Sequence, residues 1–144
     1  MNKIIYSWHN QLNMPKHDLE WHRQDIADEL QELTEARGFI DRWSEYSDIC
    51  YTYTRALWSG HKDIKLPISY FMYLIGLVYM FPKYSLRWNF FHKPGKKFGN
   101  DNVTEVRNPK KIHKLEDIAA KYDIDKIEFV LEAKKLLKTS FFLK

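Results

Sequence analysis

The sequence contains a single cysteine, Cys50, among its 144 residues. One thiol cannot form an internal disulfide framework or a cysteine-rich zinc site, and it fits a reducing compartment. The first fourteen residues hold no apolar run long enough for a signal peptide, so we expect a cytoplasmic protein. The six histidines show no paired metal-ligand spacing, which argues against a zinc site.

Long hydrophobic runs are also scarce. The most apolar stretch, residues 66–82, reads LPISYFMYLIGLVYMFP and is interrupted by Pro67 and Gly76. A membrane-spanning helix usually needs about 20 apolar residues. Because nothing else in the chain resembles a membrane segment, we expect a helix at about 67–81 that is buried in the core or between subunits. The sequence therefore predicts no membrane association.

Internal repeats and low-complexity tracts are absent, and the chain length suits one domain. Periodic apolar positions predict an all-α fold, a bundle-like domain of four to five helices with a long basic loop. The expected segments are a helical hairpin at about 15–59, the apolar helix at about 67–81, the basic loop at about 83–113 and C-terminal helices at about 114–138.

Charge is distributed unevenly along the chain. The formal net charge is +4, but residues 18–48 are acidic and residues 92–114 carry most of the positive excess. An acidic site next to a basic region suits a metal-bound polyphosphate, whereas a basic region alone would suit nucleic acid or simple solubility.

Two acidic pairs stand out within the predicted hairpin. Glu29 and Glu32 form the first pair, Glu45 and Asp48 form the second, and Gly38 lies between them. A spacing of three residues places both carboxylates of a pair on one face of a helix. Because Gly38 allows only a short connection, the two helices should pack antiparallel and their acidic faces should converge.

Convergent carboxylates suit a hard divalent cation. Magnesium prefers six oxygen ligands and commonly takes a few carboxylates together with substrate phosphates. The alternative interpretation is an ordinary solvated helix face, because other acidic pairs of this region have the same three-residue spacing. Apolar neighbours such as Leu30, Leu33 and Trp43 place the acidic faces next to a packed seam, which favours the metal site.

The pattern of these four acids resembles a known signature. Glu29-x-x-Glu32, twelve residues, then Glu45-x-x-Asp48 is similar to the motif of the all-α nucleoside triphosphate pyrophosphohydrolases. That superfamily includes MazG-like proteins, dimeric dUTPases and phosphoribosyl-ATP pyrophosphohydrolase. The resemblance covers roughly residues 18–60, and beyond Gly60 the chain departs from the family pattern.

The resemblance implies a MazG-like fold, a homo-oligomer (dimer or tetramer) and a housekeeping role in nucleotide pools. It implies that Glu29, Glu32, Glu45 and Asp48 bind Mg²⁺, with Mn²⁺ able to substitute, and are the catalytic residues. The implied reaction is hydrolysis of a nucleoside triphosphate between its α- and β-phosphates, which releases a nucleoside monophosphate and pyrophosphate.

Candidate substrate contacts follow from position and composition. Trp21 beside His22 precedes the acidic run and is the preferred wall of a base pocket, although tryptophans at helical spacing also serve as core. Arg55 and Lys62 are candidate phosphate contacts because they follow the second acidic pair, and three further lysines are candidates from composition alone. For each cation the alternative is a solvated surface charge. The three lysines are Lys93, Lys96 and Lys97.

Two other functions compete with the enzyme. In the first, a helical nucleic-acid-binding module uses the basic segment 88–114, where lysines alternate with aromatic residues that could stack on bases. In the second, the chain keeps the fold but is a catalytically silent partner protein. The aromatic residues concerned are Trp88, Phe90, Phe91 and Phe98.

Overall fold

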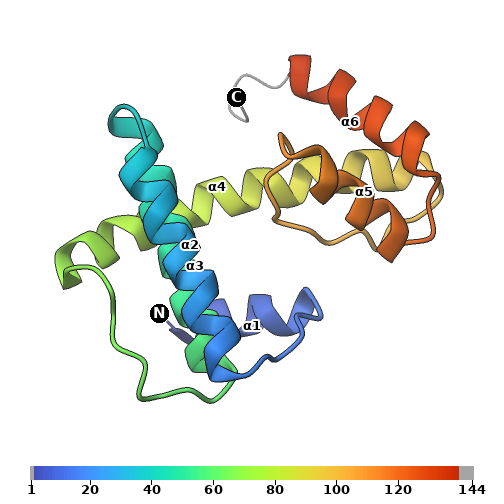
Figure 1. Ribbon diagram of the computed structural model, residues 1–144. Coiled ribbons are helices and arrows are strands. Elements are labelled where there is room, and N and C mark those ends of the chain that lie inside the picture. The colour runs from blue at the N-terminus through green and yellow to red at the C-terminus, as the bar shows by residue number, and fades with distance from the viewer. Residues whose placement is uncertain (1, 140–144) are drawn as a thin grey trace. The chain divides into compact units, whose positions relative to one another are not determined.

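The computed structural model describes residues 2–139, and within this range it consists of helices without strands. The predicted all-α class is confirmed. Figure 1 shows the helices in chain order. Their bounds are α1 Asn2–Gln11, α2 Leu19–Glu35, α3 Phe39–Trp58, α4 Tyr70–Lys97, α5 Ile112–Lys121 and α6 Lys126–Thr139.

The chain divides into two compact units, Met1–Pro82 and Lys83–Lys144, where the chain length alone led us to expect one domain. The division also separates the charges. The first unit has 8 lysines and arginines against 11 aspartates and glutamates, and the second has 15 against 8. The uneven charge of the sequence is therefore a difference between two structural units.

The first unit is built around the hairpin of α2 and α3, which run antiparallel along each other (Figure 1). Asp18 caps α2, because its carboxylate accepts a hydrogen bond from the Trp21 amide at 2.8 Å. Gly38 adopts φ +95° in the short connection, a backbone conformation that favours glycine. The predicted hairpin is thus present, with helix bounds of 19–35 and 39–58.

Close packing joins α3 to the first part of α4 in this unit. A Cβ atom at Gly76 would lie 2.6 Å from the Cys50 Sγ atom and 2.7 Å from the Tyr46 carbonyl oxygen. The Cys50 thiol is fully buried and donates a hydrogen bond to the Tyr73 carbonyl oxygen at 3.3 Å. Burial raises the pKa of Cys50 to about 12, so this cysteine is a packing residue, as its position predicted.

The prediction of a basic loop at 83–113 is largely wrong, because α4 continues through Pro82 and Pro94 to Lys97. Between the prolines and lysines of this segment, buried residues recur at helical spacing and form a stripe. Its members Tyr84, Arg87, Phe91 and Pro94 are buried. Burial of this stripe favours the helix despite the prolines, and the real loop is confined to residues 98–111.

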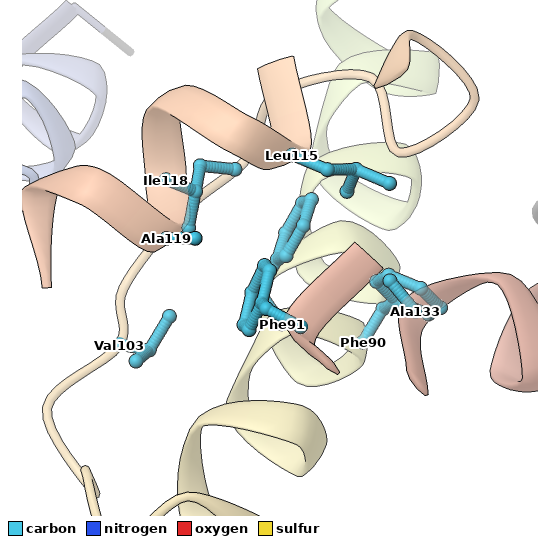
Figure 2. Packing of buried hydrophobic residues seen from close by; sticks show 8 residues of the cluster. Phe90, Phe91, Val103, Leu115, Ile118, Ala119 and Ala133 are labelled. Carbon is cyan, nitrogen blue, oxygen red and sulfur yellow. The ribbon is translucent and has the colours of Figure 1, made fainter. Parts of the chain in front are cut away.

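The second unit has its own hydrophobic core. Figure 2 shows Phe91 of α4 among side chains from α5, α6 and the loop before α5. Asp125 caps α6 by accepting a hydrogen bond from the Glu128 amide at 2.8 Å. The fully buried members of this core are Phe91, Val103, Ile118, Ala119, Phe129 and Ala133, with Phe90 and Leu115 nearly so.

None of the helices that the structure describes is long and apolar enough to cross a membrane. The apolar segment predicted as a helix at about 67–81 forms the first part of α4, and it begins at Tyr70. Its inner face is buried at Tyr73, Leu77 and Met80, whereas Phe71 and Val78 are exposed.

Candidate metal centre on the helical hairpin

The two acidic pairs lie in the half of the hairpin nearer Gly38. Glu29 and Glu32 are one turn apart on α2, and Glu45 and Asp48 are one turn apart on α3. The two helices run antiparallel along each other (Figure 1), and this arrangement brings acids of the two pairs together. The three-residue spacing therefore places the two acids of each pair on one helix face, and the turn at Gly38 brings the two pairs together.

Three of the four predicted ligands converge closely. Glu29, Glu32 and Glu45 each place one carboxylate oxygen within 4.8 Å of the corresponding oxygens of the other two. Glu29 and Glu45 are partly buried, and Glu32 is exposed. Asp48 does not belong to this close triad, but its charge acts on Glu29 more strongly than that of any other neighbouring carboxylate. All four acids consequently share one electrostatic site.

Glu29 is the most perturbed member of this site. Burial, followed by the charges of Asp48, Glu32, Asp25 and Glu45, raises its pKa to about 8. Loss of hydration and repulsion between like charges both disfavour the carboxylate form. A divalent cation bound among these carboxylates would relieve the repulsion.

Asp25 is a fifth carboxylate that the sequence motif did not identify. It lies one turn before Glu29 on α2, is partly buried, and its charge contributes to the raised pKa of Glu29. The signal was present in the sequence, since Asp25 continues the stripe of Glu29 and Glu32. A spacing of three or four residues between acids is too common to distinguish this aspartate from the exposed Asp28.

The donor set is made of carboxylate oxygens alone. Within residues 2–139, no group that includes histidine or cysteine meets the same distance criterion. Oxygen-only donors suit Mg²⁺ or Mn²⁺ better than zinc or copper, which favour nitrogen and sulfur. The residues present therefore fit the cation that the sequence predicts.

The predicted substrate contacts Trp21, His22 and Arg55 come together at the other end of the hairpin. The Arg55 guanidinium carbon lies 4.6 Å from the centroid of the Trp21 ring. The Trp21 ring also stacks on His17, with centroids 3.9 Å apart and an interplanar angle of 18°. Trp21 is thus engaged by two side chains of the protein itself, and His22 is fully buried beside it.

The predicted lysine contacts are more dispersed. Lys62 is exposed in the turn after α3. Lys93 and Lys96 are exposed on the part of α4 that belongs to the second unit. Lys97 lies there too, and its ammonium group donates to Glu132 of α6 at 2.5 Å. Three of the four predicted lysines thus belong to a different unit from the carboxylates.

Three of the four aromatic residues of the basic segment belong to the hydrophobic core or pack against it, and the fourth, Trp88, is partly buried. Phe90 is 3% exposed and Phe91 is fully buried. Both belong to the cluster of packed side chains in Figure 2. Phe98 packs against the same cluster. A nucleic-acid site that stacks bases on Phe90 and Phe91 would require the second unit to open, so the structure does not favour the use of these two rings.

Comparisons of the chain with protein-family models, curated proteins and solved structures give no match. The similarity to the pyrophosphohydrolase signature therefore rests on the acidic motif and its hairpin.

Proposed function

We propose that the protein is a magnesium-dependent nucleoside triphosphate pyrophosphohydrolase with its metal centre on the α2–α3 hairpin. The observation that carries the proposal is the convergence of Glu29, Glu32 and Glu45, with Asp48 acting on the same carboxylates. A surface stripe of acids needs no mutual approach. Here partly buried carboxylates are held together at an electrostatic cost that a cation removes.

The carboxylates have two tasks in this proposal. Glu29, Glu32, Glu45 and Asp48 would hold the metal, and a carboxylate of the cluster would accept the proton of the attacking water. Bound magnesium would neutralise phosphate charge and lower the pKa of a bound water. The rigid helices keep the acids in place before substrate arrives, which reduces the reorganisation needed for the reaction.

The products follow from the family signature that the motif resembles. We propose cleavage between the α- and β-phosphates, which yields a nucleoside monophosphate and pyrophosphate. We also propose that the active form is a dimer or tetramer, as the resemblance implies. Light scattering coupled to size exclusion measures the oligomeric state directly.

A panel of ribo- and deoxyribonucleoside triphosphates tests the proposed activity. Each nucleotide is incubated with the protein and Mg²⁺, and pyrophosphate release is measured. We expect release from at least one nucleotide and none in EDTA. Glu32→Gln and Asp48→Asn should reduce turnover by about 100-fold or more, with unchanged helical circular dichroism.

Asp28→Asn is the matched control, because Asp28 is an exposed acid of α2 outside the convergent group. It should retain wild-type turnover. Pyrophosphate release by Glu32→Gln and Asp48→Asn at the wild-type rate would refute the ligand assignment. Absence of product from every nucleotide would refute the proposed activity.

A further inference from the structure

A second cluster of ionisable groups lies at the end of the hairpin away from Gly38. It contains His9 of α1, His22 of α2, and His17 and His61 from the segments flanking the hairpin. The ring centroids of His22 and His61 are 5.3 Å apart, and those of His17 and His22 are 6.2 Å apart. We call these four residues the histidine cluster.

The two inner members of the histidine cluster are polar groups without partners. His9 and His22 have no solvent exposure, and neither ring nitrogen of either residue has a hydrogen-bond partner in the structure. Buried polar atoms are almost always hydrogen-bonded, and each unsatisfied one costs about 1–3 kcal/mol. Four such atoms belong to His9 and His22, and a polar ligand would satisfy them.

The positive charge of Arg55 favours an anionic ligand over a cation. Its guanidinium is buried, and its positive charge acts on both His9 and His22. Together with burial, this charge lowers the pKa of His9 to about 3 and that of His22 to about 4. The imidazoles are therefore neutral at pH 7, and each offers one N–H donor. A metal cation would be repelled by Arg55, whereas an anion would be attracted.

The remaining charges around His22 do not reverse this preference. His61 and His17 act on His22 in the same direction as Arg55, and only the Asp18 carboxylate opposes them. That carboxylate is exposed and accepts the Trp21 amide hydrogen at the start of α2. On the outer side of the cluster, Trp21 is 37% exposed, and His17 and His61 are partly exposed. These three residues are the solvent-accessible part of this region.

We propose that the histidine cluster and Arg55 bind a phosphate group through imidazole and guanidinium N–H donors. This group would be a distal phosphate of the substrate or the pyrophosphate product, an identification that rests on the proposed function. The cluster and the carboxylates share the helices α2 and α3, because His22 precedes Glu29 by seven residues and Arg55 follows Asp48 by seven. Seven residues correspond to about 10 Å along a helix axis. The Arg55 guanidinium lies beside Trp21 and donates a hydrogen bond to the Pro15 carbonyl oxygen at 3.2 Å.

Metal-free binding of pyrophosphate tests this assignment. Calorimetric titration of the protein with sodium pyrophosphate in EDTA should show saturable binding, and NMR should show shifts of the His22 ring resonances. His22→Leu replaces the imidazole by an apolar group of similar size and should weaken binding by about tenfold or more. His113→Leu is the control, because His113 is exposed on α5 in the second unit, and it should bind as wild type.

A second pair of variants keeps the test informative if His22→Leu does not fold. Arg55→Lys and His61→Asn should also weaken pyrophosphate binding, with helical content verified by circular dichroism. No saturable binding by the wild type would overturn the assignment. Undiminished affinity in the variants that fold would overturn it as well.

The source of the phosphate is resolved by further titrations. If a nucleoside triphosphate competes with pyrophosphate and a nucleoside monophosphate does not, the distal phosphates are the bound group. Competition by the monophosphate would overturn that placement. The proposed function fails on different measurements, namely Mg²⁺ dependence and nucleotide turnover, so each failure can be recognised separately.

Discussion

Glu29 is a carboxylate whose surroundings oppose its own charge. Four other acids act on it, and its partial burial removes part of its hydration. At most positions such a group would be replaced by an apolar or amide side chain, because repulsion lowers the stability of the fold. The presence of Glu29 is explained if the metal-bound protein is the functional form, because the metal-free fold is then less stable than it could be in exchange for metal binding.

Glu29→Gln should therefore stabilise the metal-free protein. The pKa of Glu29 is raised to about 8, so the ionised form, present above that pH, is unfavourable in the fold. The stability of the wild type in EDTA should fall as pH rises from about 4.5 through 8, because the folded state binds the proton more tightly than the unfolded state. At pH 9 the substitution should add on the order of 1–3 kcal/mol, measured by urea denaturation.

The same experiment with excess Mg²⁺ should reverse the order. The wild type should gain stability from the cation, and Glu29→Gln should gain little. Asp28→Asn, outside the convergent group, should behave as wild type in both conditions. A Glu29→Gln protein that is less stable than wild type in EDTA at pH 9 would contradict the electrostatic account of this site.

His9 predicts a pH effect of the opposite sign. Burial, then the charges of Arg55 and His22, lowers its pKa from 6.5 to about 3. Between these values the unfolded state binds the proton and the folded state does not, so stability should fall as pH drops from about 6.5 toward 3. The slope that one such histidine contributes approaches about 1.4 kcal/mol per pH unit.

His9→Leu should reduce this loss, as measured by urea denaturation at pH 7 and pH 5 in a phosphate-free buffer. His22 contributes in the same direction, because its pKa is lowered to about 4, so part of the slope should remain. His113→Leu, at an exposed position, serves as the control and should keep the full slope. An unchanged slope in His9→Leu would show that the buried imidazole is not responsible.

At the scale of helices, the hairpin could be predicted and the long helix α4 could not. Gly38 ends one periodic segment and begins another, and its positive φ is the conformation that only glycine adopts readily. In α4 the same local reasoning fails, since Pro82 and Pro94 are read as helix breakers. Tertiary burial of Phe91 and its stripe overrides that local signal, and such packing is invisible in a single segment of sequence.

Gly76 shows how α4 depends on close packing with α3. An added Cβ would approach both the Cys50 sulfur and the Tyr46 backbone to less than 3 Å, so the helices would have to separate. Gly76→Ala should consequently lower the free energy of unfolding by about 1–3 kcal/mol, although alanine is the better helix former. Urea denaturation followed by circular dichroism measures the change.

Val78→Ala provides the comparison for that substitution. Val78 lies two residues further along α4 and is 74% exposed, so its replacement removes little buried surface. Its stability should remain within about 0.5 kcal/mol of wild type. If Gly76→Ala were as stable as Val78→Ala, the close contact between α3 and α4 would not be a constraint on the fold.

At the scale of the whole molecule, two units with separate cores share one helix. The acidic hairpin and the histidine cluster belong to the first unit, and the excess of lysine belongs to the second. Composition along the sequence revealed this asymmetry, but the boundary within α4 depends on which residues pack together. The motif likewise identified four acids, whereas the inclusion of Asp25 required the fold.

This division predicts where a metal ion changes local stability. Because Glu29, Glu32 and Glu45 connect α2 to α3, cation binding should protect the amides of residues 19–58 from hydrogen exchange. The amides of α5 and α6 lie in the other unit and should exchange at unchanged rates. Hydrogen–deuterium exchange with mass spectrometry, with and without Mg²⁺, measures both regions in one sample. Asp48→Asn should weaken the protection of the hairpin, and Asp28→Asn should preserve it. Equal protection of both units would show that the cation acts on the whole molecule rather than through the hairpin carboxylates.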